Sequence, residues 1–265
     1  MTWLSSLPVG ALLAGCLVLA LLVVVATTLA VRALVPEAER DRVQRIAAPL
    51  MPALGAAFAI LTALTLSSEA GYLRAAEGYV SDEGAAAARL AWAATNPGVD
   101  SEPIHAALRD YLTTTRDREW SGSAAASGDD PETERAIAVM ERVVRTQAAR
   151  WAQVGTPAST ELLTSVDAVT STRRARIVAA DHEIPGLYVV TLVASGVALI
   201  ANASALAVRG GTRISLLVAG LAGVVGLSLA LLFALSAPWR GPITVGGDAI
   251  DAVVRDLDTG FFTPG

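Results

Sequence analysis

Four long stretches of the sequence carry no charged side chain and no histidine, and this feature constrains the fold more than any other. They are residues 8–31, 47–68, 185–208 and 214–238. Each matches or exceeds the ~20 apolar residues that an α-helix needs to cross a bilayer. The pattern predicts a multi-pass protein of the cell membrane, with the lipid bilayer as its first partner, and excludes an ordinary water-soluble domain.

The order of these stretches predicts an all-α membrane protein with four transmembrane helices in two hairpins and an inserted four-helix extramembrane bundle. We expect residues 1–68 to form the first hairpin, 69–184 the bundle, 185–238 the second hairpin and 239–265 a tail. An even number of spans places the N-terminus, the bundle and the tail on one side of the membrane. The positive-inside rule does not identify that side, because six arginines lie near the spans on each face.

The tail sequence is typical of one short amphipathic helix, which Gly260 is expected to end. Aspartates occupy the polar face of this helix, but they are spread along it and lack the ligand loop of a calcium site. The apolar face is expected to consist of Ile250, Val253, Val254, Leu257 and Phe261.

Catalytic and cofactor-binding motifs are absent from the sequence. All 20 basic residues are arginines, so no P-loop lysine exists, and the only histidines are His105 and His182. The run 181–183 (Asp-His-Glu) is a poor metal chelate, because neighbouring side chains on a helix point in different directions. We therefore expect no enzyme activity, no catalytic residues, no cofactor and no metal. The arginines form no tract, which argues against a nucleic-acid partner.

One face of the second span is semi-polar and could line a pore. Gly55, Phe58, Thr62 and Thr65 share this face, and Glu69 follows at its exit. In a ring of subunits the stripe would surround a channel with a hydrophobic constriction at Phe58. The alternative is that the threonines bond to their own helix and the stripe packs against other spans. No span contains a charged residue, which argues against a proton-driven transporter.

Glu83 is predicted to form a structural ion pair. It falls in the apolar stripe of the first bundle helix, where an unpaired carboxylate would be costly. The last bundle helix returns to the membrane with Arg173, Arg174 and Arg176. Counting helical rise from the two membrane boundaries brings Glu83 and Arg173 to similar heights, which makes Arg173 the expected partner. The alternative is an exposed carboxylate on a helix weakened by Gly84.

Several short motifs follow one another across nearly the whole chain. They are Trp3-Leu4, Arg32-Ala-Leu34-Val35-Pro36, Glu83-Gly84, Glu119-Trp120, Arg173-Arg174-Ala-Arg176, Pro185 and Pro238-Trp239-Arg-Gly241. In this order they resemble the bestrophin-like family of bacterial membrane proteins. The resemblance implies a two-hairpin membrane fold. Through a more distant relation to bestrophins, it also implies a ring-shaped anion channel with both termini in the cytoplasm.

Two functions are compatible with these patterns. The first is a homo-oligomeric ion channel of bestrophin-like plan. The second is a membrane-anchored interaction or sensory scaffold, in which the acidic bundle (18 acidic residues against 12 arginines in 69–184) binds a protein partner. An oligomer in detergent would support the channel, because a monomer supplies no complete pore wall.

Overall fold

The structure, a computed structural model, is helical wherever it shows regular secondary structure in the described residues. These are residues 9–120, 130–152, 157–180, 184–208, 210–236, 239 and 243–263. Several residues named above lie outside them: Trp3, Leu4, Asp181, His182, Glu183, Pro238, Arg240 and Gly241.

Four of the helices are long and apolar enough to cross a membrane, as the sequence predicted. They are α1 (Val9–Leu34), α2 (Arg40–Ala93), α6 (Gly186–Ala207) and α7 (Thr212–Leu235). A short 3-10 turn, Glu37–Glu39, precedes α2. The second span and the predicted first bundle helix are one continuous helix, because nothing in α2 after Pro52 interrupts its hydrogen-bond ladder.

The remaining helices are shorter and more polar. They are α3 (Ser101–Glu119), α4 (Pro131–Ala152), α5 (Pro157–Ala180) and α8 (Asp248–Asp258). The chain divides into two compact units. Unit 1 comprises the described residues of Met1–Tyr72 and Glu183–Ile243, and unit 2 those of Leu73–His182 and Thr244–Gly265.

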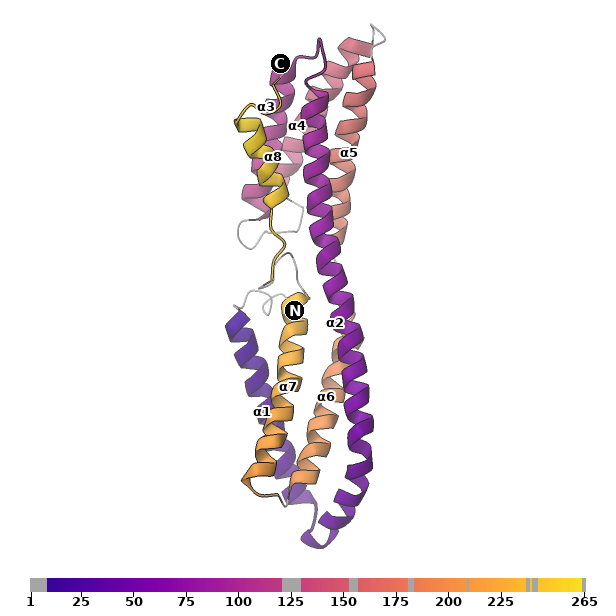
Figure 1. The fold of residues 1–265 in the computed structure, drawn as a ribbon, viewed down its shortest axis with the longest axis vertical. Coiled ribbons are helices and arrows are strands. Elements are labelled where there is room, and N and C mark those ends of the chain that lie inside the picture. The colour runs from indigo at the N-terminus through magenta and orange to yellow at the C-terminus, as the bar shows by residue number, and fades with distance from the viewer. Residues whose placement is uncertain are drawn as a thin grey trace. The chain divides into compact units, whose positions relative to one another are not determined.

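Unit 1 is held together by close packing of its apolar helices. Here α1 packs against α7 and α6, and α6 packs against α7 (Figure 1). The predicted hairpin of the first two spans stays a prediction. Helices α1 and α7 approach closely at Gly226, where a Cβ would lie 3.0 Å from the Cys16 carbonyl oxygen. Such a small residue lets two helix backbones approach in lipid.

Unit 2 contains the polar helices and the second part of α2. In it α3 packs against α4, α4 against α5, and α8 against α3. Asp130 caps α4, because its Oδ1 accepts hydrogen bonds from the backbone N–H groups of Glu132 (2.8 Å) and Thr133 (3.2 Å). The core is built from buried leucine, methionine and valine side chains of these helices.

The tail helix α8 buries its predicted face with one correction. Ile250, Val253, Val254 and Leu257 are buried, but Phe261 is 59% exposed. Phe262 is buried instead, because the helix ends before Gly260, whose φ of 72° resets the direction of the chain.

Candidate functional site

The centre of unit 2 holds a buried network of charged side chains from three helices. Arg176 on α5 donates to Glu83 Oε2 on α2 at 2.5 Å and to Glu119 Oε2 on α3 at 2.6 Å. Arg173 donates to the other Glu119 oxygen at 2.7 Å. The hydroxyl of Tyr111 donates to Glu83 Oε1. These contacts tie α2, α3 and α5 together at one level of the unit.

The network is electrically balanced and almost completely removed from solvent. Glu83 is 0% exposed and Arg176 is 1% exposed. Burial lowers the pKa of the Arg176 guanidinium, but Glu83 and Glu119 outweigh it and hold that pKa above its ordinary value. Burial and the Glu83 carboxylate raise the pKa of Tyr111 well above its ordinary value. Two guanidinium groups thus face two carboxylates, with a neutral phenol as an additional donor.

Trp120 covers one side of this network and connects it to the tail. The Arg176 guanidinium carbon lies 4.9 Å from the centre of the Trp120 ring, in cation–π geometry. The indole N–H donates to the Val245 carbonyl at 3.0 Å. The segment before α8 is therefore bonded to the side chain that shields Arg176.

Gly84 gives the tail helix access to the same region. A Cβ at this position would lie 3.0 Å from both the Cβ and the carbonyl oxygen of Ala249, on α8. Only glycine leaves room for α8 at this distance without a shift. The small residue after Glu83, noted in the sequence as part of a motif, is thus explained by the close approach of a second helix.

The structure gives Glu83 a different arginine from the one predicted. Its partner is Arg176, and Arg173 pairs with Glu119. Arg174, the third member of the cluster, is exposed. Helical rise alone could not separate Arg173 from Arg176, because they are less than one turn apart. The sequence argument also omitted Glu119, a second acceptor that binds both arginines.

Two network members were missed as site residues, although the sequence contained a signal for each. Glu119 belongs to the Glu119-Trp120 motif of the family resemblance. Tyr111 lies eight residues earlier on α3, and this spacing puts the two side chains on one helical face. A glutamate that shares the apolar face of a helix with a tyrosine is the sequence pattern that would have identified both residues.

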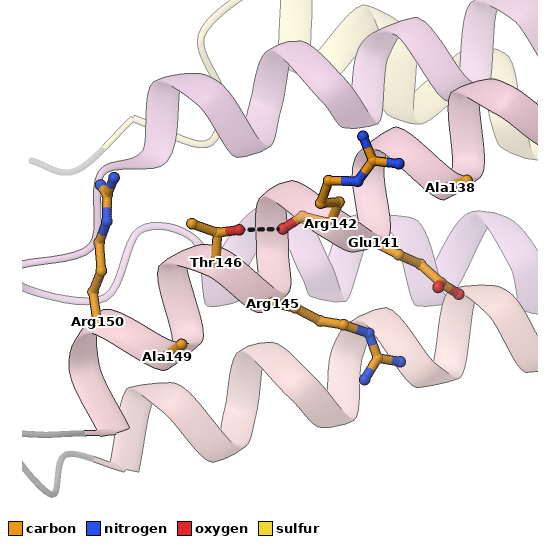
Figure 2. A pocket seen from close by; sticks show the side chains of 7 residues that line it. All are labelled: Ala138, Glu141, Arg142, Arg145, Thr146, Ala149 and Arg150. Carbon is orange, nitrogen blue, oxygen red and sulfur yellow. Dashed lines mark hydrogen bonds between the residues drawn. The ribbon is translucent and has the colours of Figure 1, made fainter.

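An open hollow lies on the outer face of α4 (Figure 2). It has a volume of about 780 Å³ and is lined by α4 residues alone: Ala138, Glu141, Arg142, Arg145, Thr146, Ala149 and Arg150. In the part of the chain that the structure describes, no group of three or more His, Cys, Asp or Glu side chains is placed to hold a metal.

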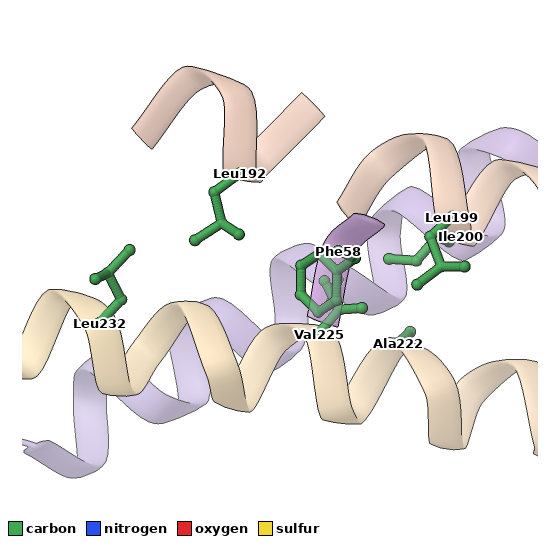
Figure 3. Packing of buried hydrophobic residues seen from close by; sticks show 8 residues of the cluster. Phe58, Leu192, Leu199, Ile200, Ala222, Val225 and Leu232 are labelled. Carbon is green, nitrogen blue, oxygen red and sulfur yellow. The ribbon is translucent and has the colours of Figure 1, made fainter. Parts of the chain in front are cut away.

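The semi-polar stripe of α2 is turned into unit 1. Phe58 is 6% exposed and packs in a cluster with Leu192, Leu199 and Val225 from α6 and α7 (Figure 3). Thr62 on the same stripe is also buried. This placement matches the packing alternative, since a pore lined by Phe58 would require α6 and α7 to leave it.

The other members of the stripe agree with that orientation. Gly55 and Thr65 are half-buried and Glu69 is buried. The Thr65 hydroxyl donates to the Leu61 carbonyl of its own helix at 2.7 Å. Of the residues named as pore-lining, Phe58 and Thr62 are thus buried inside unit 1, and Thr65 bonds to its own helix.

The opposite face of α2 is free in unit 1. Its exposed residues recur at alternating steps of four and three, which is one helical face: Ile46, Leu50, Ala53, Ala57, Ile60, Leu64, Ser67 and Gly71. None of them is charged. The second span therefore presents an apolar stripe with small residues in its middle to lipid or to another molecule.

Comparison with known proteins identifies the relatives of this chain. The sequence pattern of the Bestrophin-like domain matches residues 18–250. A solved bacterial bestrophin homologue from Klebsiella pneumoniae, a point variant, superposes with a TM-score of 0.64 at 12% identity, covering 92% of this chain and 97% of that one. A crystal structure described as a membrane protein gives a TM-score of 0.65 with the same identity and coverage. No curated protein matches the sequence.

Proposed function

The chain belongs to the Bestrophin-like family, and on this premise we propose that it forms a homo-oligomeric channel that conducts ions, with anions as the favoured class. The family match over residues 18–250 carries the proposal. The similarity to a bacterial bestrophin homologue supports the fold on which it depends. The resemblance of the sequence motifs supplies the anion preference.

We place the pore on the free face of α2 in place of the buried stripe. In a ring of copies, the face with Ile60 and Leu64 would meet the axis, while Phe58 stays packed against α6 and α7. An apolar lining gates by excluding water from the narrowest ring of side chains. A carboxylate at the pore mouth would repel anions, but Glu69 is buried on the other side of the helix and does not face this pore.

The proposed topology has two hairpins, with the N-terminus, unit 2 and the tail in the cytoplasm. It rests on four candidate spans, whose even number returns the chain to its starting side. Reporter fusions at Ala124 and at the C-terminus should report the same compartment. Reports from opposite compartments would overturn the span count.

The proposed function is tested by two measurements: the mass of the oligomer and the flux of chloride. The purified chain should show a multiple of 27.2 kDa in detergent and should release chloride from loaded liposomes. Ile60→Ala and Leu64→Ala should widen the constriction and raise that flux severalfold. Ala91, which is buried in unit 2, offers a matched control through Ala91→Ser, which should leave flux unchanged.

The scaffold alternative has its own expected outcome. A chain that is inserted and oligomeric, but releases no chloride with any of these variants, would be a membrane-anchored interaction module. A chain that is monomeric in detergent and in nanodiscs would also exclude the proposed pore, because one α2 helix cannot surround an axis.

A further inference from the structure

The outer side of α4 carries four exposed arginines in a region that is acidic overall. Residues 69–184 contain 18 acidic residues and 12 arginines. On α4, however, Arg135, Arg142, Arg145 and Arg150 are all exposed along the outer side of the helix. The inner side of α4 packs through Met140 and other apolar residues against α3 and α5.

The hollow on this face has a floor of small residues, and charged side chains flank that floor. Ala138 and Ala149 form part of its lining, and their separation of eleven residues, about three turns, keeps them on one face. Figure 2 shows the Arg142 and Arg145 side chains extending to opposite sides of the helix, with Arg150 farther along. Alanines between two basic flanks leave room for a second helix to approach closely, because small residues let helix backbones come near each other.

The positive charge of this face is only partly compensated within the chain. Arg145 pairs with Asp167 at 3.3 Å, and both partners are exposed. Glu141 accepts a hydrogen bond from Thr170 at 2.8 Å. Within the described ranges, neither Arg142 nor Arg150 has an ion pair. Of the arginines that line the hollow, these two are therefore the ones available to a partner.

The arrangement selects the class of partner. The arginine side chains diverge, so they do not clamp a single phosphate as converging donors would. Arg142 and Arg150 are eight residues apart, about 12 Å along the helix. Carboxylates at a similar spacing on a helix would reach both. A flat anionic surface could contact the arginines, but it would not fill the hollow above the two alanines.

We propose that the outer face of α4 is a docking surface for an acidic helix of a partner protein. The partner helix would carry a seam of small residues with glutamates on both flanks of that seam.

The test uses the full chain in nanodiscs and a designed peptide as the probe. The peptide is a fluorescent helix with alanines along one seam and glutamates on both flanks. It should bind with an affinity that falls as salt is raised. Arg142→Gln with Arg150→Gln should weaken binding at least tenfold. Arg89→Gln with Arg174→Gln, which removes two exposed arginines outside α4, should change it less than twofold.

A charge reversal keeps the test independent of folding. Arg142→Glu with Arg150→Glu should lose the glutamate peptide and bind a version of it that carries arginines instead. Equal binding by wild type and the double glutamine variant would overturn the proposal, and so would equal weakening by the Arg89 and Arg174 pair. Tight binding of pyrophosphate or of anionic vesicles at Arg142, without peptide binding, would assign the face to phosphate and also overturn it. Chloride flux is measured separately, so loss of the channel function leaves this result unaffected.

Discussion

The two units use opposite means to hold helices together. Unit 1 has many large apolar side chains exposed on its spans, and its helices join through glycine contacts and a few polar bonds, such as Asn202 Nδ2 to the Ala47 carbonyl at 3.0 Å. Unit 2 buries its apolar side chains and places four charges at its centre. The contrast follows from the surroundings: lipid gives apolar helices no hydrophobic reason to associate, whereas water does.

This difference determines where charge is tolerated. In unit 2 the buried Glu83 carboxylate accepts from Arg176 and Tyr111, and the buried Glu119 carboxylate accepts from Arg176 and Arg173. In the spans of unit 1 the nearest equivalents are hydroxyl and amide groups, as in the Thr27 to Ser204 bond of 3.0 Å. A single charge placed there would have no partner to offset the cost of its dehydration. Disrupting each unit should therefore reveal a different dominant interaction.

The largest effect is expected from breaking the buried network of unit 2. Glu83→Gln leaves Arg176 with one carboxylate instead of two, and should lower the free energy of unfolding by about 3 kcal/mol. Hydrogen exchange of the α3 and α5 amides measures this loss within the full chain. Glu77→Gln, which removes an exposed carboxylate from the same helix, is the control and should change stability by less than about 0.5 kcal/mol. A similar value for Glu83→Gln would mean that the network does not hold the unit together.

The next effect is expected in the apolar cluster of unit 1. Phe58→Ala should cost about 2 kcal/mol, less than the ~3–5 typical of a water-soluble core, because lipid can replace part of the lost contact. Thermal unfolding in detergent measures it, with the exposed Ile60→Ala as the matched control. If Phe58→Ala raises chloride flux without any loss of stability, then the buried stripe lines the pore, contrary to the packing seen here.

Two glycines of α2 should respond with opposite signs. Gly84→Ala places a methyl group 3.0 Å from Ala249, so the free energy of opening of α8 should fall by about 1 kcal/mol. Gly78→Ala meets no atom within 4 Å and should stabilise the helix by about 0.5–1 kcal/mol. Exchange rates of the α8 amides report the first change. Faster exchange with both variants, or with neither, would contradict the close packing of α8 on α2.

The last effect is confined to high pH. The pKa of Tyr111 is raised in the folded chain, so its stabilising contribution is complete below the ordinary tyrosine pKa of about 10 and is lost as pH rises above it. The unfolded chain releases this proton first, and stability falls by at most about 1.4 kcal/mol per pH unit. Tyr111→Phe should reduce the slope of unfolding free energy against pH above 10. An unchanged slope would assign the alkaline loss to other groups.

Much of the architecture could be predicted because it depends on local composition. A run of uncharged residues of membrane length needs no tertiary partner to be recognised. The helix terminus at Gly260 follows from backbone chemistry within one turn, and it is present. The position of Phe262 could not be predicted, because it depends on how the chain leaves the helix and not on helical period.

What the sequence by itself determined is therefore the helical class, the four candidate spans, the family and the need of Glu83 for a cationic partner. Only the tertiary structure decided that the partner is Arg176, that Glu119 binds both arginines, and that Gly84 admits α8. It also turned Phe58 inward and left Ile60 free. The physical reason is the distance along the chain over which each feature is determined. Span length and helix caps are set by neighbouring residues. The pairing of side chains and the choice of buried helix face depend on how each helix is rotated about its axis, which no local pattern contains.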